Sequence, residues 1–251
     1  MDKIVIIPTY NERDNIEKIL RAVYNLQQNF HVLVIDDGSP DGTADIVRQL
    51  QPQLSNTVFL EERRGKLGLG TAYIHGFKWA IAKGYQFIFE MDADFSHNPS
   101  DLPRLYAACK SGGADVAIGS RYVRGGGVSN WPWDRIALSK GASVYTRIIT
   151  WMPVADPTAG FMCYRREVLE TINLDEIHFV GYAFQIEMKF AAWKLGFKLT
   201  EVPIQFEDRK LGESKMSKGI IKEGVLGVLK LRWYSLFTHY RKRVKTAEVN
   251  R

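Results

Sequence analysis

The chain has 251 residues, of which 45% are hydrophobic and 25% charged, and its formal net charge at pH 7 is +6. This length can bury one large core, and the apolar fraction excludes a disordered or fibrous chain. No stretch reaches the roughly 18 uncharged apolar residues that a membrane-spanning helix needs. The two cysteines, Cys109 and Cys163, are too few for a disulfide or metal framework, which favours a reducing cytosol.

The positive charge is concentrated at the end of the chain. From Lys210 to Arg251 there are 11 Lys or Arg and 3 Asp or Glu, a local charge of +8, whereas the first 209 residues hold 23 and 25, a charge of −2. This balance, together with the absence of a recognised binding module, argues against a nucleic-acid partner. The basic segment therefore needs its own explanation.

Short apolar runs alternate with amphipathic stretches over the first 120 residues. Runs rich in Val, Ile and Phe predict buried strands at Ile4–Ile7, Val32–Ile35, Val58–Leu60, Phe87–Phe89 and Val116–Ile118. The segments between them predict helices at Asn15–Gln27, Thr43–Leu50, Thr71–Lys83 and Asp101–Ser111. This alternation predicts an α/β fold with a mostly parallel sheet flanked by helices on both faces.

The pattern is looser after Trp131. Four further elements are predicted there: a helix at Arg135–Thr150, a short strand at Ala159–Tyr164, a helix at Tyr182–Lys194, and a strand at Leu199–Phe206 that Pro203 interrupts. The final prediction is an amphipathic helix at Lys218–Lys245, dense in aromatic, aliphatic and basic residues. Such a helix either lies on a membrane surface or packs on the core.

Polar loops follow four of the predicted strands, and in a parallel sheet ligands bind beyond the carboxyl ends of the strands. The loops are PTYNE from Pro8, DDGSPDG from Asp36, EMDAD from Glu90 and GSR from Gly119. One such loop is commonly only a turn or a helix cap. Four together predict one shared site. The glycine pattern of a dinucleotide-binding first loop and a phosphate-binding Walker loop are both absent from the sequence.

The sharpest local signal is Asp92-Ala93-Asp94. Residues two apart at a strand end face the same way, so both carboxylates can reach one ligand. Hard oxygen donors of this kind suit Mg²⁺ or Mn²⁺ bound together with a diphosphate. Asp36 and Asp37 are adjacent, so one faces the site, where it can bind a ribose hydroxyl or a base edge, and we expect the other to cap the helix that begins near Gly42.

Basic residues supply the complementary charge. Arg121 follows a predicted strand, and Arg209 and Lys215 flank a Gly-Glu-Ser turn. Arg135 opens a predicted helix four residues before Ser139, so the two share one face and can bind a phosphate together.

With these motifs in place, the chain resembles the dolichol-phosphate mannose synthases, or polyprenol-phosphate mannosyltransferases, of the family 2 glycosyltransferases, which have a GT-A (Rossmann-like) fold. The resemblance runs through PTYNERDNI, VIDDGSPDGT, GLGTAYIHGF, MDADFSHNP, GSRYVRGGGVSNWPWDR, DPTAGFMCYRR, GYAFQIEM and FEDRKLGESKM. DDGSPDGT and DAD are shared with many sugar transferases, whereas GSRY…NWP and GESKM are more selective for polyprenyl-phosphate acceptors. It implies a catalytic domain at residues 1–217 and a basic membrane-interface tail at residues 218–251.

The resemblance also implies roles for individual residues. The positions that match donor-binding positions are Pro8, Tyr10, Glu12, Ile35, Asp37, Asp92, Ala93, Asp94, Arg121, Arg209 and Lys215. Asp92, Asp94 and Ser96 match the metal site, and Arg121, Arg135 and Ser139 match the acceptor-phosphate site. Asp94 and Arg121 are the candidate catalytic residues.

The implied reaction moves mannose from GDP-mannose to a polyprenyl or dolichyl phosphate with inversion, giving polyprenyl-phosphate β-mannose and GDP. A phosphate monoester has a second pKa of about 6, so the acceptor is largely a dianion at neutral pH and needs no strong general base. Two alternatives stay open: a related transferase that uses UDP-glucose or another nucleotide sugar, and a non-catalytic nucleotide-binding subunit of a membrane complex.

The expected location follows from the lipid acceptor and the basic tail. We expect a cytoplasmic protein, peripheral on the cytoplasmic face of a membrane, because each Lys or Arg near an anionic leaflet adds about 1 kcal/mol of attraction. Small membrane subunits are partners in some relatives, and the resemblance extends that expectation to this chain.

Overall fold

The computed structural model describes residues 1–181, 183–207 and 218–241. Its strands are β1 Lys3–Thr9, β2 His31–Asp36, β3 Val58–Glu62, β4 Phe87–Glu90, β5 Val116–Ser120, β6 Gly127–Ser129, β7 Met162–Arg165, β8 Leu199–Pro203 and β9 Gln205–Glu207. Its α-helices are α1 Arg13–Tyr24, α2 Thr43–Leu50, α3 Leu69–Ala82, α4 Leu102–Lys110, α5 Trp133–Thr150, α6 Arg166–Thr171, α7 Ala183–Lys194 and α8 Lys218–Tyr234. Two short 3-10 helices lie at Pro99–Asp101 and Leu174–Glu176.

Seven strands form one twisted sheet in the order β3-β2-β1-β4-β7-β5-β8. All its neighbouring strands are parallel except β7, which runs antiparallel between β4 and β5. The predicted α/β class and mostly parallel sheet are confirmed. Pro203 ends β8, and the chain leaves the sheet to form β9, which pairs in parallel with β6 as a separate two-stranded ribbon.

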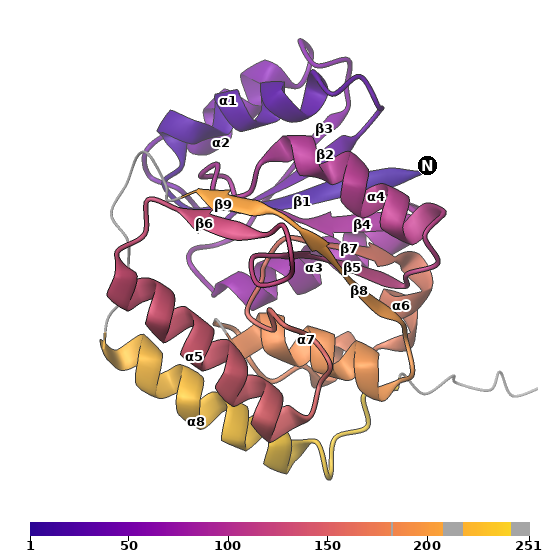
Figure 1. Ribbon diagram of the computed structural model, residues 1–251. Helices are drawn as coiled ribbons and strands as arrows, with labels where there is room; N and C mark the ends of the chain where they lie inside the picture. Colours follow the sequence, from indigo (N-terminus) through magenta and orange to yellow (C-terminus); the bar gives the residue numbers. More distant parts are fainter. Residues whose placement is uncertain (182, 208–217, 242–251) are drawn as a thin grey trace, which may run out of the picture.

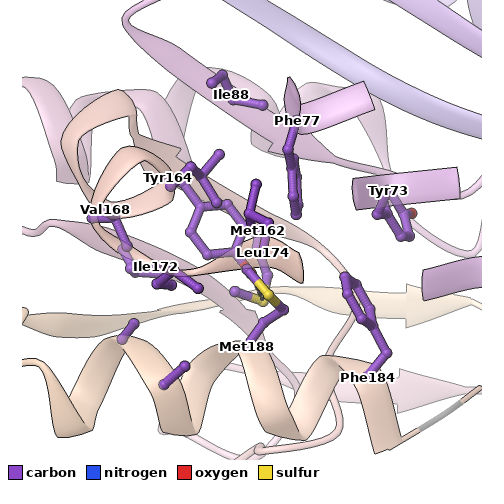
Figure 2. Packing of buried hydrophobic residues seen from close by; sticks show 14 of the residues in the cluster. Tyr73, Phe77, Ile88, Met162, Tyr164, Val168, Ile172, Leu174, Phe184 and Met188 are labelled. Carbon is purple, nitrogen blue, oxygen red and sulfur yellow. Dashed lines mark hydrogen bonds between the residues drawn. The ribbon is translucent and has the colours of Figure 1, made fainter. Parts of the chain in front are cut away.

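Helices cover both faces of the sheet, as Figure 1 shows, and a hydrophobic core lies on each face. Along β1, Val5 and Ile7 pack with α1, α2 and α4, whereas Ile4 and Ile6 point to the opposite face, which α3, α6 and α7 cover. Side chains of a strand alternate between faces, so a strand covered on both sides is apolar throughout. On the second face, aromatic side chains such as Tyr73, Phe77 and Phe184 fill the space between the sheet and α7 (Figure 2).

The C-terminal helix is shorter than predicted. The helix expected at Lys218–Lys245 ends at Tyr234, and the chain turns so that the carbonyl of Tyr240 accepts a hydrogen bond from the backbone N–H of Asn173 at 2.6 Å. Tyr240 is only 4% exposed and its ring meets that of Phe190 edge-on, so burying this tyrosine accounts for the turn. The expected part beyond Arg241 lies outside the described residues.

Helix α8 packs with one side on α5 and α7, and lies beside α5 in Figure 1. Val228 and Leu231 are buried in that contact, whereas Val225, Leu229 and Trp233 are exposed. One side of the helix therefore packs on the core, as one of the two alternatives predicts, and another side faces solvent. In the part of the chain that the structure describes, no helix combines the length and apolar character needed to cross a bilayer.

Helix α3 approaches the sheet closely at Gly76. A Cβ atom there would lie 2.7 Å from Cγ2 of Ile6, whereas at Gly141 on α5 it would meet nothing within 4 Å. Overpacking costs about 1–3 kcal/mol, and replacing a helical glycine by alanine gains up to about 1 kcal/mol.

We therefore expect Gly76→Ala to lower the free energy of unfolding and Gly141→Ala to raise it by up to about 1 kcal/mol. Urea unfolding followed by circular dichroism measures both. Equal gains for the two variants would show that α3 has room to move away from β1.

Candidate active site

Four loops that follow strands of the main sheet lie at one edge. Thr9 at the end of β1 pairs with Asp36 at the end of β2, and β4 runs parallel to β1. Strand β5 has the same direction, because β7 runs antiparallel to both β4 and β5. The loops predicted to share a site therefore leave the same edge of the sheet.

Asp36 closes the loop after β2. Its carboxylate is 1% exposed and accepts hydrogen bonds from Thr9 Oγ1 at 2.8 Å and from the backbone N–H and hydroxyl of Ser39 at 2.8 and 2.6 Å. The expectation that Asp36 or Asp37 caps the following helix is wrong. The N-cap residue is Gly42, and Asp41 before it accepts with Oδ1 the backbone N–H of Thr43 at 3.0 Å and its hydroxyl at 2.6 Å.

Asp37 is held by Arg63, a largely buried arginine that the sequence reasoning did not single out. Arg63 Nε lies 2.7 Å and Nη2 2.6 Å from Asp37 Oδ1, and Arg63 Nη1 donates to Thr71 Oγ1 at 2.9 Å. Lys66, in the same loop after β3, places its ammonium 4.9 Å from the centre of the Tyr10 ring. The loop after β3 thus fixes Asp37 through Arg63 and covers the Tyr10 ring with Lys66.

The other predicted donor residues nearby differ in how they are placed. Pro8 is half-buried on β1 opposite Ile35 on β2. The Ile35 side chain is fully buried in the core, so only its backbone can meet a ligand. Glu12 precedes α1, and its Oε2 accepts a hydrogen bond from Asn15 Nδ2 at 2.9 Å.

The Asp92–Asp94 segment follows β4. Asp92 is partly exposed, and its Oδ1 lies 3.4 Å from the hydroxyl of Tyr73 on α3. Asp94 and Ala93 are buried, and Asp94 Oδ1 accepts the backbone N–H of Ser96 at 3.0 Å. Ser96, predicted as a metal ligand, is 3% exposed and orients Asp94 through its backbone.

His97 packs against the Asp92–Asp94 segment and binds its backbone. Its Nδ1 accepts the backbone N–H of Asp92 at 3.1 Å, and its ring stacks on Phe161 with centroids 4.9 Å apart. Burial lowers the pKa of His97 to about 4, so the ring is neutral at pH 7 and keeps its Nδ1 lone pair for Asp92. The sequence offered no signal for this role, because the hydrogen bond from Asp92 and the contact with Phe161 arise only in the fold.

The carboxylates present fit a divalent cation bound with a diphosphate. Among the described residues, no group of three or more His, Cys, Asp or Glu side chains could hold a metal by itself. Mg²⁺ is usually held by one or two carboxylates plus substrate phosphates and water. Asp92 and Asp94 would supply the carboxylates of such a site. A groove of about 450 Å³ lies beside Asp94, between α1 and the connection from β4 to α4.

Arg121 is locked by a carboxylate 35 residues further along the chain. Its Nε and Nη2 each donate to Asp156 at 2.7 Å, and Nη2 also donates to Thr158 Oγ1 at 2.7 Å. The pair is buried, with side chains 9% and 0% exposed. Burial by itself would raise the pKa of Asp156, but the hydrogen bonds and charge of Arg121 bring it below its usual value.

The predicted acceptor-phosphate residues come together through two aromatic side chains. Ser139 Oγ lies 2.7 Å from the hydroxyl of Tyr122, whose ring lies 5.1 Å from Arg121 Cζ. Trp131 lies 4.0 Å from Arg135 Cζ and 5.7 Å from Arg121 Cζ. Arg121, Arg135 and Ser139 therefore belong to one cluster, and their role as an acceptor-phosphate site stays a prediction.

A second buried network lies beneath the Asp92–Asp94 segment. Gln185 Nε2 on α7 donates to Glu90 Oε2 at 2.6 Å, and Lys189 Nζ donates to the carbonyls of Ala159 and Gln185 at 2.5 and 2.9 Å. Burial raises the pKa of Glu90 to about 7 and lowers that of Lys189 to about 8. The network fixes α7 against the segment before β7.

The predicted Arg209 and Lys215 lie outside the described residues.

The sequence is similar to that of known glycosyltransferases. The sequence profile of Glycosyl transferase family 2 matches residues 4–172. A polyprenol monophosphomannose synthase from Mycolicibacterium smegmatis is 48% identical over 225 residues, covering 90% of this chain and 84% of that protein. An undecaprenyl-phosphate mannosyltransferase from Micrococcus luteus is 44% identical, covering 94% and 98%.

The fold is also found among solved structures. A mannosyltransferase from Pyrobaculum calidifontis in complex with GDP-Man and Mn²⁺ superposes with a TM-score of 0.55 at 16% identity, covering 94% of this chain and 75% of that one. At this identity the likeness shows the fold alone.

We expect Asp156→Asn to lower the free energy of unfolding by about 3 kcal/mol, because it leaves the buried Arg121 charge uncompensated. Urea unfolding at pH 7 measures this loss. Because the pKa of Asp156 is lowered in the folded state, its stabilisation is complete above the usual value of 3.8 and is lost as the pH falls below it. The difference between variant and wild type therefore narrows below about pH 4.

A matched control is Asp175→Asn, which removes an exposed ion pair with Lys78 and should cost less than about 1 kcal/mol. Equal losses from Asp156→Asn and Asp175→Asn would contradict the structural role of the buried pair.

Proposed function

The chain belongs to glycosyl transferase family 2, and on that premise we propose that it transfers mannose from GDP-mannose to a polyprenyl phosphate, giving polyprenyl-phosphate β-mannose and GDP. The observation that carries the proposal is the pairing of two chemistries at one sheet edge. Acidic residues after β4 suit a metal–diphosphate, and the cationic cluster around Arg121 and Arg135 suits a second phosphate. The names of the relatives with 48% and 44% identity support the same reaction.

For the donor, Tyr10 and Asp37 would hold the nucleoside. Arg63 keeps the Asp37 carboxylate in one orientation, so the carboxylate is ready to accept hydrogen bonds from ribose hydroxyls or base N–H groups. Lys66 covers the Tyr10 ring. Arg209 and Lys215 remain proposed diphosphate ligands on the basis of the family resemblance.

Asp92 and Asp94 would hold a divalent cation, for which we propose Mg²⁺ or Mn²⁺. Such a cation, when bound, neutralises the diphosphate and stabilises the charge that develops on the leaving GDP. His97 and the backbone of Ser96 keep the two carboxylates in place before any ligand arrives. Presence of Mn²⁺ in the Pyrobaculum calidifontis structure is in line with this assignment.

The acceptor phosphate would bind between Arg121, Arg135 and Ser139. Because it is largely a dianion at neutral pH, it attacks the sugar without a strong base, and the main task of the protein is to bring two anions together in line. Arg121 can offer Nη1, since Nε and Nη2 are used by Asp156. A single displacement inverts the anomeric centre.

The first test is transfer of labelled mannose from GDP-mannose to a short-chain polyprenyl phosphate. We expect lipid-linked label with Mg²⁺ or Mn²⁺ and none with chelator. Asp94→Asn should reduce transfer below detection and weaken Mn²⁺ binding measured directly by electron paramagnetic resonance. Asp45→Asn, on the exposed side of α2, is the control and should behave as wild type.

The same assay with other donors separates the alternatives. Faster transfer from UDP-glucose than from GDP-mannose would replace the proposed donor. Donor binding without transfer to any lipid phosphate would indicate a non-catalytic subunit. Near-normal activity of Asp94→Asn would remove that residue from the metal site.

We also propose that the protein docks on the cytoplasmic face of a membrane through exposed side chains of α5, α8 and the turn that follows. The large apolar residues exposed there are Trp133, Leu138, Val144, Ile148, Trp151, Val225, Leu226, Leu229, Trp233, Leu236 and Phe237. Basic side chains lie among them; Arg232 places its Cζ 4.9 Å from the Trp151 ring and so links the two helices. Apolar and aromatic groups mixed with cations are typical of a surface that lies on anionic lipid.

Sedimentation with vesicles tests this docking. We expect the wild type to bind vesicles containing phosphatidylglycerol, and the double variant Ile148→Asp/Phe237→Asp to bind at least tenfold more weakly, since each side chain loses about 1.5–3 kcal/mol of apolar transfer. Tyr24→Asp, on α1 across the sheet, is the control. Unchanged binding of the double variant would contradict the proposal and leave a protein partner as the occupant of this surface.

A further inference from the structure

Trp131 lies in the segment that joins β6 to α5, with two arginines over its indole ring. Arg135 Cζ is 4.0 Å and Arg121 Cζ 5.7 Å from the ring, both within the range of a cation–π interaction. The ring of Phe206 on β9 meets the indole edge-on, with centroids 5.4 Å apart and an interplanar angle of 74°. Trp131 is thus the common neighbour of both guanidinium groups.

The two arginines differ in how they are held. Arg121 is fixed by Asp156 and Thr158 from one side, so its plane is set without Trp131. Arg135 comes from the first turn of α5, and its guanidinium lies at the shortest cation–ring distance in the cluster. The flat face of Trp131 is therefore one contact that holds Arg135 near the fixed Arg121.

The indole N–H of Trp131 adds a second observation. Its Nε1 atom is buried and has no hydrogen-bond partner among the residues that the structure describes. A buried donor without an acceptor is costly, and indole can only donate. The partner that this N–H requires is an oxygen acceptor. Among the described residues, two guanidinium groups lie against the indole ring, so an anionic acceptor suits the position.

We propose that Trp131 is a direct ligand of the acceptor phosphate, donating its indole N–H to a phosphate oxygen while its ring holds Arg135 beside the same group. The inference rests on the proposed function and extends it, because none of the assignments above gives Trp131 a role. It makes the site more selective for a phosphate monoester over an alcohol, since a single hydroxyl oxygen cannot satisfy the indole N–H and two guanidinium groups together.

Two substitutions separate the two parts of this role. Trp131→Phe keeps a ring and removes the N–H, whereas Trp131→Leu removes both. We expect Trp131→Phe to raise the KM for a short-chain polyprenyl phosphate about tenfold or more, and Trp131→Leu to raise it further. The KM for GDP-mannose and the Tm should stay close to the wild-type values for Trp131→Phe.

The matched control is Trp79→Phe, which removes an indole N–H that donates to Glu61 at 3.1 Å, away from the cluster. It should leave the acceptor KM unchanged. If Trp131→Phe also leaves the acceptor KM unchanged while the wild type transfers mannose, the proposed ligand role is wrong. If Trp131→Phe raises both KM values equally, its effect is structural and the proposal also fails. Absence of transfer by the wild type would instead refute the proposed function itself.

Discussion

The buried pair of Arg121 and Asp156 is the interaction on which the acceptor side of the molecule depends. Arg121 follows β5, Asp156 lies between α5 and β7, and the backbone N–H of Asp156 donates to Glu201 on β8 at 3.0 Å. The charge pair and this backbone hydrogen bond together connect three segments. A buried pair of this kind contributes little net stability compared with apolar packing, yet losing one partner is costly. Its benefit here is geometric, because a guanidinium bound through two nitrogens cannot rotate.

The donor side also contains an arginine–aspartate pair. Asp37 is bound by Arg63, as Asp156 binds Arg121, and in both cases the partners come from different loops. Acids and bases at this sheet edge are therefore oriented by each other before substrate arrives, which reduces the entropy that binding two anionic substrates would otherwise cost. The neutral ring of His97 has a comparable effect on the backbone of Asp92.

Much of this architecture follows from local sequence, since apolar runs covered on both faces and loops at strand ends are local patterns. The strands and helices predicted for the first 120 residues are found with ends that differ by three residues or fewer. Asp156, Arg63, His97 and Trp131 were missed because their roles depend on partners that only the fold brings near. The extent of α8 was overestimated for a related reason, because burial of Tyr240 against Phe190 overrides the continuing amphipathic pattern.

The small ribbon of β6 and β9 has a consequence for how the two substrates are spaced. Gly127 pairs with Gln205 and Ser129 with Glu207, so the two strands run in register and in the same direction. One strand leads into the segment with Trp131 and Arg135, and the other leads towards Arg209 and Lys215. The pairing therefore sets where β9 lies beside the segment that carries Trp131, whose ring Phe206 of β9 meets edge-on. A slip of one residue in this pairing would move Phe206 by about 3.3 Å against that ring and so shift the support of the proposed acceptor site by more than an in-line displacement tolerates.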